Sequence, residues 1–246
     1  MTDLHCHALF DIDDGATDFY AMAKMLSIAY DDGIRDICFT PHFKQYVFEN
    51  DDDDILSYSQ KIATNFKLAL EYASEHYPDM NLYLGNEIMF HHDIVSSISS
   101  KQCLPIADTS YVLIEFKPST PFFEMRSALS NLLRKGFFPV LAHVERYCDL
   151  VSDFSKVREL SELGVLIQVN ASSILKFKFG KSARFIKKLF KNSLVDLIAT
   201  DAHDTEHYAP LMSGAVAIIS RKYGEQIAKK VSCTTPKMIL SNQKKH

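Results

Sequence analysis

Short apolar runs alternate with longer amphipathic segments along most of the chain, and each apolar run has the length of a β-strand. The runs predicted as strands are residues 3–7, 34–40, 82–85, 111–114, 138–142, 165–169 and 194–199. Apolar residues recur at helical spacing between most of these runs, in the segments 17–33, 55–76, 127–135, 155–163, 183–191 and 210–230. Seven strands that alternate with helices are typical of a parallel α/β fold.

Two helix starts can be predicted from residue types. Thr17 is the expected N-cap of the first helix and Gly33 its C-cap, because these residue types are common at helix ends. Four consecutive aspartates, residues 51–54, precede the second helix. A metal site is one interpretation of this acidic run. We favour the other, since acidic side chains stabilise the first turn of a helix.

The placement of polar residues favours a closed or nearly closed barrel over an open sheet. In such a barrel the site lies at the C-terminal ends of the strands, so each strand can present a residue there. An open doubly wound sheet would bind its ligand at one switch point and would show a glycine-rich phosphate loop. Gly15 is the only glycine near the first strand–helix turn, and no G-x-G-x-x-G surrounds it. We therefore expect one barrel domain over residues 1–246.

Nine histidine, aspartate and glutamate side chains end or follow the predicted strands. They are His5, His7, Asp14, His42, Glu87, Glu115, His143, Asp201 and His203. His5 and His7 stand two apart on a strand, so both rings point to one face. Any one of the nine, taken alone, is more often a surface or core side chain than a ligand. All of them together would be costly to bury without cations, so the joint pattern predicts metal ions.

The residue types indicate which metals and which chemistry to expect. Histidine and carboxylate ligands without cysteine suit manganese, iron or zinc better than calcium. Nine ligands are too many for one ion and enough for two or three. Neighbouring divalent ions polarise phosphoryl oxygens and supply hydroxide at neutral pH. The pattern therefore predicts phosphoester hydrolysis, which is slow enough without a catalyst to need so strong an electrostatic device.

The composition sets further limits on function and compartment. The 246 residues are 47% hydrophobic, enough for one large core. A net charge of -4 and a pI near 6.2 give no overall attraction to nucleic acid or membranes, and we see no basic stripe for a polyanion. Five scattered cysteines favour reduced thiols, with Cys6 packed in the core. With neither a signal peptide nor an apolar run of about 18 residues, a cytoplasmic protein without membrane insertion is expected.

An ordered set of motifs resembles the polymerase-and-histidinol-phosphatase (PHP) superfamily. The motifs are H-C-H near the N-terminus, F-D-x-D-D-G, T-P-H, G-N-E-I, L-I-E-F, A-H-V-E-R-Y, Q-V-N-A-S-S and T-D-A-H. Within the superfamily they look most like the manganese-dependent protein-tyrosine phosphatases of bacterial capsule and exopolysaccharide operons. The resemblance runs from the first residues to about Asp204.

The resemblance implies a distorted (β/α)7 barrel with three metal ions. The implied ligand sets are His5, His7, Glu87 and Asp201 for the first ion, Glu87, Glu115 and His143 for the second, and Asp14, His42 and His203 for the third. Glu87 would bridge the first two ions, and a metal-activated hydroxide would attack phosphorus. Arg146 would bind the phosphate, so Arg146, Glu87 and Asp201 are the implied catalytic residues. The implied partner is a phosphotyrosine protein, namely the tail of a tyrosine autokinase.

One feature departs from this pattern. Phosphatases of this type carry a second phosphate-binding arginine soon after the D-x-H motif, whereas residues 204–210 contain none. Arg126 and His207 are the candidates to replace it. Histidinol-phosphate phosphatase is the alternative enzyme, although the acidic loop 11–15 lacks a histidine that those enzymes carry near the third metal. A non-catalytic PHP domain that binds a partner is the alternative from another class.

Overall fold

The computed structural model describes residues 1–45, 52–176 and 180–242. Its strands within these ranges are β1 (Thr2–Cys6), β2 (Asp36–Phe39), β3 (His42–Phe43), β4 (Asn81–Leu84), β5 (Glu87–Met89), β6 (Tyr111–Glu115), β7 (Phe138–Leu141), β8 (Leu166–Asn170) and β9 (Leu197–Ala199). All paired strands are parallel. They form a sheet of order β1-β2-β4 and a second of order β3-β5-β6-β7-β8-β9.

The last strand returns to the first, so the parallel sheet is curled. A bridge pairs Cys6 with Ala202, and the N–H of His7 donates to the carbonyl oxygen of Ala202 at 2.8 Å. The N–H of Asp201 donates to the carbonyl oxygen of His5 at 2.8 Å. The two i, i+2 pairs predicted as ligands therefore lie next to each other, although almost 200 residues separate them in sequence.

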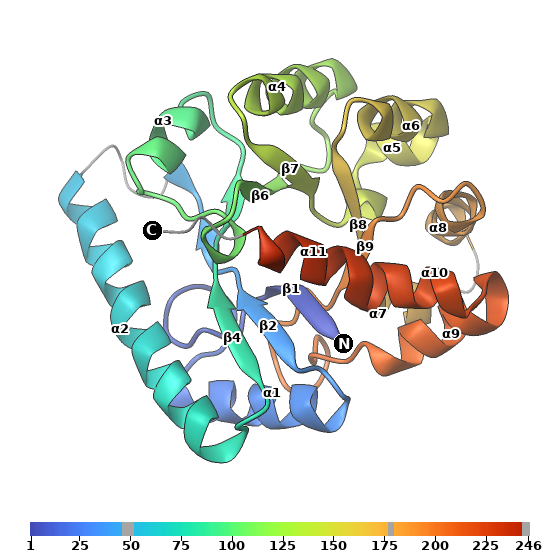
Figure 1. The fold of residues 1–246 in the computed structure, drawn as a ribbon. Helices are drawn as coiled ribbons and strands as arrows, with labels where there is room; N and C mark the ends of the chain where they lie inside the picture. The colour runs from blue at the N-terminus through green and yellow to red at the C-terminus, as the bar shows by residue number, and fades with distance from the viewer. Residues whose placement is uncertain (46–51, 177–179, 243–246) are drawn as a thin grey trace.

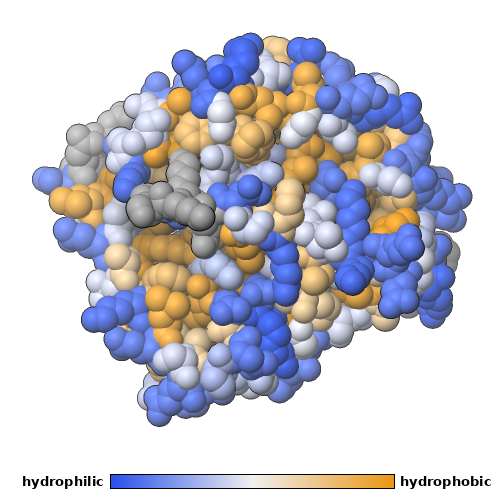
Figure 2. Space-filling model, viewed as in Figure 1, coloured by the Kyte–Doolittle hydropathy of each residue, from blue (hydrophilic) through white to orange (hydrophobic). Residues whose placement is uncertain are grey.

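Helices surround the curled sheet (Figure 1). They are α1 (Phe19–Asp31), α2 (Asp52–His76), α3 (Ile94–Ser99), α4 (Phe122–Arg134), α5 (Cys148–Ser152), α6 (Phe154–Glu162), α7 (Ala171–Lys176), α8 (Lys181–Lys191), α9 (Ser213–Tyr223), α10 (Glu225–Lys229) and α11 (Thr235–Ser241). The main apolar cluster joins these helices to the strands, as Ile62 and Ala69 of α2 do with Leu82 of β4. Figure 2 shows hydrophobic side chains gathered between α2 and β4.

A smaller apolar cluster ties the C-terminal helix to the sheet. Ile239 and Leu240 of α11 pack with Leu4, Val140 and Leu197 of three strands. The helix lies across the strands at the centre of the view in Figure 1. No helix in the three described ranges is both long enough and apolar enough to cross a membrane.

The alternation of strands and helices is confirmed, while several boundaries differ from the predictions. Two predicted strands continue as second short strands, β3 after Pro41 and β5 after Asn86. Asp18 caps α1 in place of Thr17, because its carboxylate accepts the N–H of Ala21 at 2.8 Å. Segment 210–230 is not one helix, since α9 ends at Tyr223 and Gly224, which has a φ of 99°, separates it from α10.

Three further predictions concern the ends of helices and of the chain. The C-cap of α1 is Asp32 and not Gly33 as predicted; Gly33 is the next residue and has the positive φ of 91° that glycine adopts just after a helix. Of the four aspartates at 51–54, Asp51 lies outside the described residues and Asp52 begins α2, in agreement with a helix start. The polar tail predicted from residue 241 lies outside the described residues beyond Asn242.

Candidate metal centre

Four fully buried side chains form the first group of potential ligands. His5, His7, Glu87 and Asp201 each offer one ligand atom, and these atoms lie within 4.8 Å of one another. Oε2 of Glu87 is 3.2 Å from Nε2 of His5 and 3.2 Å from Nε2 of His7. Oδ1 of Asp201 is 3.2 Å from Nε2 of His5. This set is the one that the resemblance implies for the first ion.

Glu87 also faces a second group. Its Oε1 lies 2.8 Å from Nε2 of His143, which is 3.6 Å from Oε1 of Glu115. On the other side, Nδ1 of His42 lies 3.0 Å from Oε2 of Glu87 and 3.9 Å from Oε2 of Glu115. The two oxygens of Glu87 thus point toward different neighbours, which is the arrangement that a bridging carboxylate requires.

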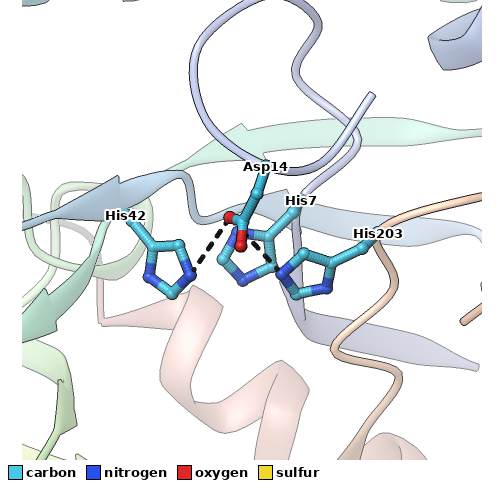
Figure 3. Close-up of side chains that lie close together, drawn as sticks. All are labelled: His7, Asp14, His42 and His203. Carbon is cyan, nitrogen blue, oxygen red and sulfur yellow. Dashed lines mark ion pairs between the residues drawn. The ribbon is translucent and has the colours of Figure 1, made fainter. Parts of the chain in front are cut away.

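The third group lies closer to solvent and is drawn in Figure 3. Asp14 points between the rings of His42 and His203, with Oδ1 at 3.4 Å from Nε2 of His42 and 3.8 Å from Nε2 of His203. The ring of His7 stacks on that of His203 at 4.0 Å and belongs to this group as well. All nine predicted ligands are therefore brought together in one place.

Unsatisfied polar atoms indicate that the cluster fits cations. Oε2 of Glu87, Oε2 of Glu115 and Oδ1 of Asp201 are buried and accept no hydrogen bond of good geometry from the described residues. Buried carboxylate oxygens are normally hydrogen-bonded, because a bare buried charge is costly. The donor set is nitrogen and oxygen only, which suits manganese, iron or zinc.

The pKa shifts of the clustered carboxyl and imidazole groups also indicate that the buried carboxylates are stabilised by positive charge. Burial opposes ionisation of Glu87, yet His5, His143 and His42 hold the pKa of its carboxyl well below the usual range. Burial and the neighbouring Glu87 raise the pKa of Glu115. Burial opposes protonation of His5, but Glu87 and Asp201 raise the pKa of its imidazole. A divalent cation would supply this charge in place of protons, so binding should release protons.

A wide cavity of about 850 Å³ opens over the cluster. Glu87, Glu115, Asp201 and His203 line it together with Arg146. The side chain of Arg146 is 43% exposed and donates to Oδ2 of Asp201 at 2.5 Å. The predicted phosphate-binding residue therefore stands at the mouth of the cluster.

Comparison with known proteins gives concordant results. A family model for capsular polysaccharide synthesis, CpsB/CapC, matches residues 1–241. The chain belongs to the CpsB/CapC family. It is 34% identical to the tyrosine-protein phosphatase CpsB of Streptococcus pneumoniae, over 99% of both chains. It is 28% identical to the tyrosine-protein phosphatase YwqE of Bacillus subtilis, over 99% of this chain and 92% of that one.

A solved structure extends the similarity to three dimensions. It comes from crystal structures of YwqE from Bacillus subtilis and CpsB from Streptococcus pneumoniae, described as metal-dependent tyrosine phosphatases. The superposition has a TM-score of 0.84 at 25% identity and covers 100% of this chain and 96% of that one. The resemblance noted from the motifs is thus confirmed at the level of the CpsB/CapC family.

The sequence did not reveal several residues that hold the proposed metal ligands in place. Asp13 accepts a hydrogen bond from Nδ1 of His7 at 2.8 Å and from the N–H of His42 at 2.9 Å. Burial opposes ionisation of Asp13, but its hydrogen bond with His7 lowers the pKa of the carboxyl to about 2. Such carboxylate–histidine contacts fix the ring orientation of metal ligands. The F-D-x-D-D-G motif contains this residue, but the resemblance implies its neighbour Asp14 as the ligand.

Two buried amides form a second support. The N–H of His143 donates to Oε1 of Gln168 at 2.6 Å, and Nε2 of Gln168 donates to Oδ1 of Asn170 at 2.7 Å. Nδ2 of Asn170 in turn donates to Oδ2 of Asp201 at 2.7 Å. This series of hydrogen bonds fixes His143, which follows β7, relative to Asp201, which follows β9. The Q-V-N motif was the only signal for it in the sequence.

The backbone is also shaped around the cluster. His143 and Asp201 have φ values of 33° and 52°, which non-glycine residues rarely adopt and which cost about 1–3 kcal/mol each. Gly15 passes so close to β1 that a Cβ atom would lie 1.9 Å from the carbonyl oxygen of His7. Only glycine fits there, so the acidic loop can fold over the ligands.

Neither of the two sequence candidates for the absent second arginine, Arg126 and His207, is among the described residues that line the cavity. Arg126 forms an ion pair with Glu159 instead. Lys44, which follows β3, does line it. Lys44 is partly buried and has no ion pair with the described residues.

Proposed function

We propose that this protein is a metal-dependent protein-tyrosine phosphatase. The observation that carries the proposal is the buried cluster of ligands, in which Glu87 faces two groups. This cluster opens into a cavity that Arg146 helps to line. Membership of a family whose relatives are tyrosine-protein phosphatases supports the same activity. We further propose that the curled sheet is a distorted (β/α)7 barrel, and that residues 1–246 form a single phosphoesterase domain.

Each proposed ion has its own ligand set. The sets are His5, His7, Glu87 and Asp201, then Glu87, Glu115 and His143, and finally Asp14, His42 and His203. In the first and the third set the ligand atoms all lie within 4.8 Å of one another, whereas by that measure His42, and not His143, groups with Glu87 and Glu115. Two or three divalent ions, manganese in the first instance with iron or zinc as substitutes, match these nitrogen and oxygen donors. When bound, such ions polarise phosphoryl oxygens and make hydroxide available at neutral pH.

The chain's own part is to bind and orient the phosphate. Arg146 stands at the mouth of the cluster, and its planar guanidinium can donate to two phosphate oxygens at once. Asp201 holds it in place when no phosphate is bound, through the 2.5 Å contact. Lys44 contributes a second positive charge from another wall of the cavity. Lysine acts as a point charge, so it compensates for only part of a missing arginine.

The proposed substrate is a phosphotyrosine protein of capsule synthesis, namely the tail of a tyrosine autokinase in the cytoplasm. The description of the family, capsular polysaccharide synthesis, supports this setting. Tyr208 and Met89 line the cavity beside the charged residues and give a phenyl ring apolar contact. A cavity of about 850 Å³ is large enough for a phosphotyrosine side chain and its neighbours.

A substrate panel tests the proposal. Metal-stripped protein is reconstituted with manganese and assayed on p-nitrophenyl phosphate, a phosphotyrosine peptide and histidinol phosphate. We expect hydrolysis of the first two and a much lower kcat/KM on the third. A preference for histidinol phosphate would favour the small-molecule alternative. No hydrolysis of any of them by metal-loaded protein would favour a non-catalytic domain.

A further inference from the structure

A second cavity, away from the metal centre, is lined by residues of α7, α8 and the end of α9. These three helices can be located in Figure 1. Its volume is about 620 Å³, and it shares no lining residue with the cavity over the metal centre. Ile174 and Leu175 of α7 and Ile218 of α9 are half-buried in its walls. We call this cavity the basic groove because of the charges on its rim.

The rim of the basic groove carries four exposed cations. Lys187 and Lys191 come from α8, and Arg221 and Lys222 from the last turn of α9. None of the four forms an ion pair with a described acidic side chain. The expectation that the chain has no basic stripe is wrong here, since residues 176–191 contain seven lysines and arginines and no acidic residue.

Helix stability does not account for this charge. Cations in the last turn of a helix are favoured by the helix dipole, which could explain Lys191. The same dipole disfavours cations in the first turn, yet α8 begins with Lys181 and has Arg184 one turn later. Lys181 and Arg184 line a neighbouring cavity, while the four cations of the rim line the basic groove itself. In a protein of net charge -4, four such cations around one groove indicate an anionic partner.

The apolar side of α8 narrows the choice of partner. Phe185, Ile186, Leu189 and Phe190 are buried, so the helix has no free apolar face with which to enter a bilayer. The half-buried side chains of Ile174, Leu175 and Ile218 supply the apolar walls of the groove. A concave site with apolar walls and a basic rim fits the side chains of a polypeptide better than a flat lipid surface.

The short helix α7 lines the basic groove, and hydrogen bonds at its two ends link it to residues around the metal centre. Asn170, directly before α7, holds Asp201 of the metal centre. At the other end of α7, Nζ of Lys176 donates to the carbonyl oxygen of His207 at 3.1 Å and lies 4.7 Å from the ring centroid of Tyr208. Tyr208 lines the cavity over the metal centre, whereas Leu175 of α7 lines the basic groove. The metal centre and the basic groove are therefore linked through α7.

We propose that the basic groove binds an acidic segment of the same phosphotyrosine protein whose phosphate enters the metal centre. The segment carries glutamate or aspartate for the rim and apolar side chains for the walls. This inference rests on the proposed phosphatase function and adds the chemistry of the region that flanks the phosphotyrosine. Docking of this kind selects the substrate through KM, while the metal centre sets kcat.

Matched peptides test the proposal. One peptide carries a phosphotyrosine and, about ten residues away, a segment of alternating glutamate and leucine; ten residues reach at most roughly 35 Å. Its control has glutamine for each glutamate. For the wild-type enzyme we expect KM to be roughly 3- to 30-fold lower for the acidic peptide, since each exposed ion pair contributes a small factor.

Charge variants separate docking from catalysis. Lys187→Gln/Lys191→Gln and the reversal Lys187→Glu/Lys191→Glu should remove the preference for the acidic peptide and leave p-nitrophenyl phosphate turnover unchanged. The control Lys24→Gln/Lys135→Gln removes the same charge from exposed positions on α1 and after α4. It should retain the preference. An equal loss in the control would mean that net charge, and not the groove, is responsible.

Direct binding keeps the test independent of activity. The unphosphorylated acidic peptide, labelled with a fluorophore, should bind the wild-type protein and not the Lys187→Glu/Lys191→Glu variant. No binding by the wild type, or an unchanged affinity in the variant, would overturn the proposal even if the phosphatase activity is established. Variant-sensitive binding to anionic lipid vesicles or to single-stranded DNA, with none to the peptide, would overturn it in favour of another polyanion. Peptide binding without phosphatase activity would instead refute the proposed function alone.

Discussion

Arg146 donates a hydrogen bond to Oδ2 of Asp201 across 2.5 Å, and Asn170 donates to the same oxygen at 2.7 Å. The other oxygen, Oδ1, faces His5 at 3.2 Å and accepts no hydrogen bond from the described residues. The chain therefore uses one oxygen of Asp201 to position its neighbours and leaves the other for the ligand cluster. The proposed phosphate-binding residue is held beside the proposed metal site by a direct contact.

Replacing Arg146 should separate substrate binding from metal binding. Arg146→Ala is expected to lower kcat/KM on a phosphotyrosine peptide about 10- to 1,000-fold, because a charge-assisted bidentate contact is lost. Metal content and folding should stay unchanged, since Asn170 still holds Asp201. Arg146→Lys should recover only part of the activity. An Arg146→Ala enzyme within twofold of wild type would mean that the phosphate is held without this residue.

Alanine variants of Lys44 and Arg126 test which cation compensates for the absent second arginine. Lys44→Ala should raise KM for phosphotyrosine peptides several-fold, because a partly buried positive charge leaves the cavity wall. Arg126→Ala should leave KM unchanged, because Arg126 pairs with Glu159 and does not line that cavity. Steady-state kinetics on one peptide decides between them. A larger effect at Arg126 would contradict the assignment.

The bridging role of Glu87 can be tested against the outer ligand Asp14. Glu87 is buried and faces two groups of ligands, whereas the side chain of Asp14 is 67% exposed and belongs to one group. Glu87→Gln should therefore lower kcat by more than about 100-fold and reduce the metal content, because even residues around a ligand typically matter by 10- to 100-fold. Asp14→Asn should cost less. Equal losses in kcat would argue against the bridge.

Cys6 lies between two proposed ligands, yet its side chain belongs to the main apolar cluster. Burial raises the pKa of its thiol well above the usual value, so it is a poor nucleophile. Cys6→Ala should keep its metal content and its kcat within about threefold, with a modest fall in Tm from the small cavity. Cys38→Ala, which removes a buried thiol from the other cluster, is the control. A folded Cys6→Ala variant with full metal content and no activity would indicate a catalytic thiol.

The sequence was sufficient for the parts of the site that depend on strand ends. Parallel strands bring their C-terminal ends together, so ligands such as His5 and Glu115 could be grouped before their distances were known. The prediction of metal-assisted hydrolysis also followed from residue types. Buried histidines and carboxylates lie close together without a large desolvation penalty only when cations are bound between them.

The remaining parts depend on geometry that spacing does not encode. Asp13 and Asp14 are adjacent acidic residues, and only the fold of their loop sends one to Nδ1 of His7 and the other to His42. Gln168 is a neutral residue within a strand, and the Q-V-N motif that contains it does not reveal its role until its contact with His143 is seen. Whether Arg126 or Lys44 reaches the cavity depends on how a helix packs against the sheet, which periodicity does not determine.

Metal dependence is the central claim, and one titration tests it most directly. Protein stripped by a chelator is titrated with manganese, while bound metal is measured by elemental analysis and kcat/KM on a phosphotyrosine peptide is measured in parallel. We predict negligible activity without metal and a rise that follows the binding of about two to three ions per chain, with magnesium restoring less because it prefers all-oxygen octahedral sites. Full activity in excess chelator, with no metal detected, would contradict the account.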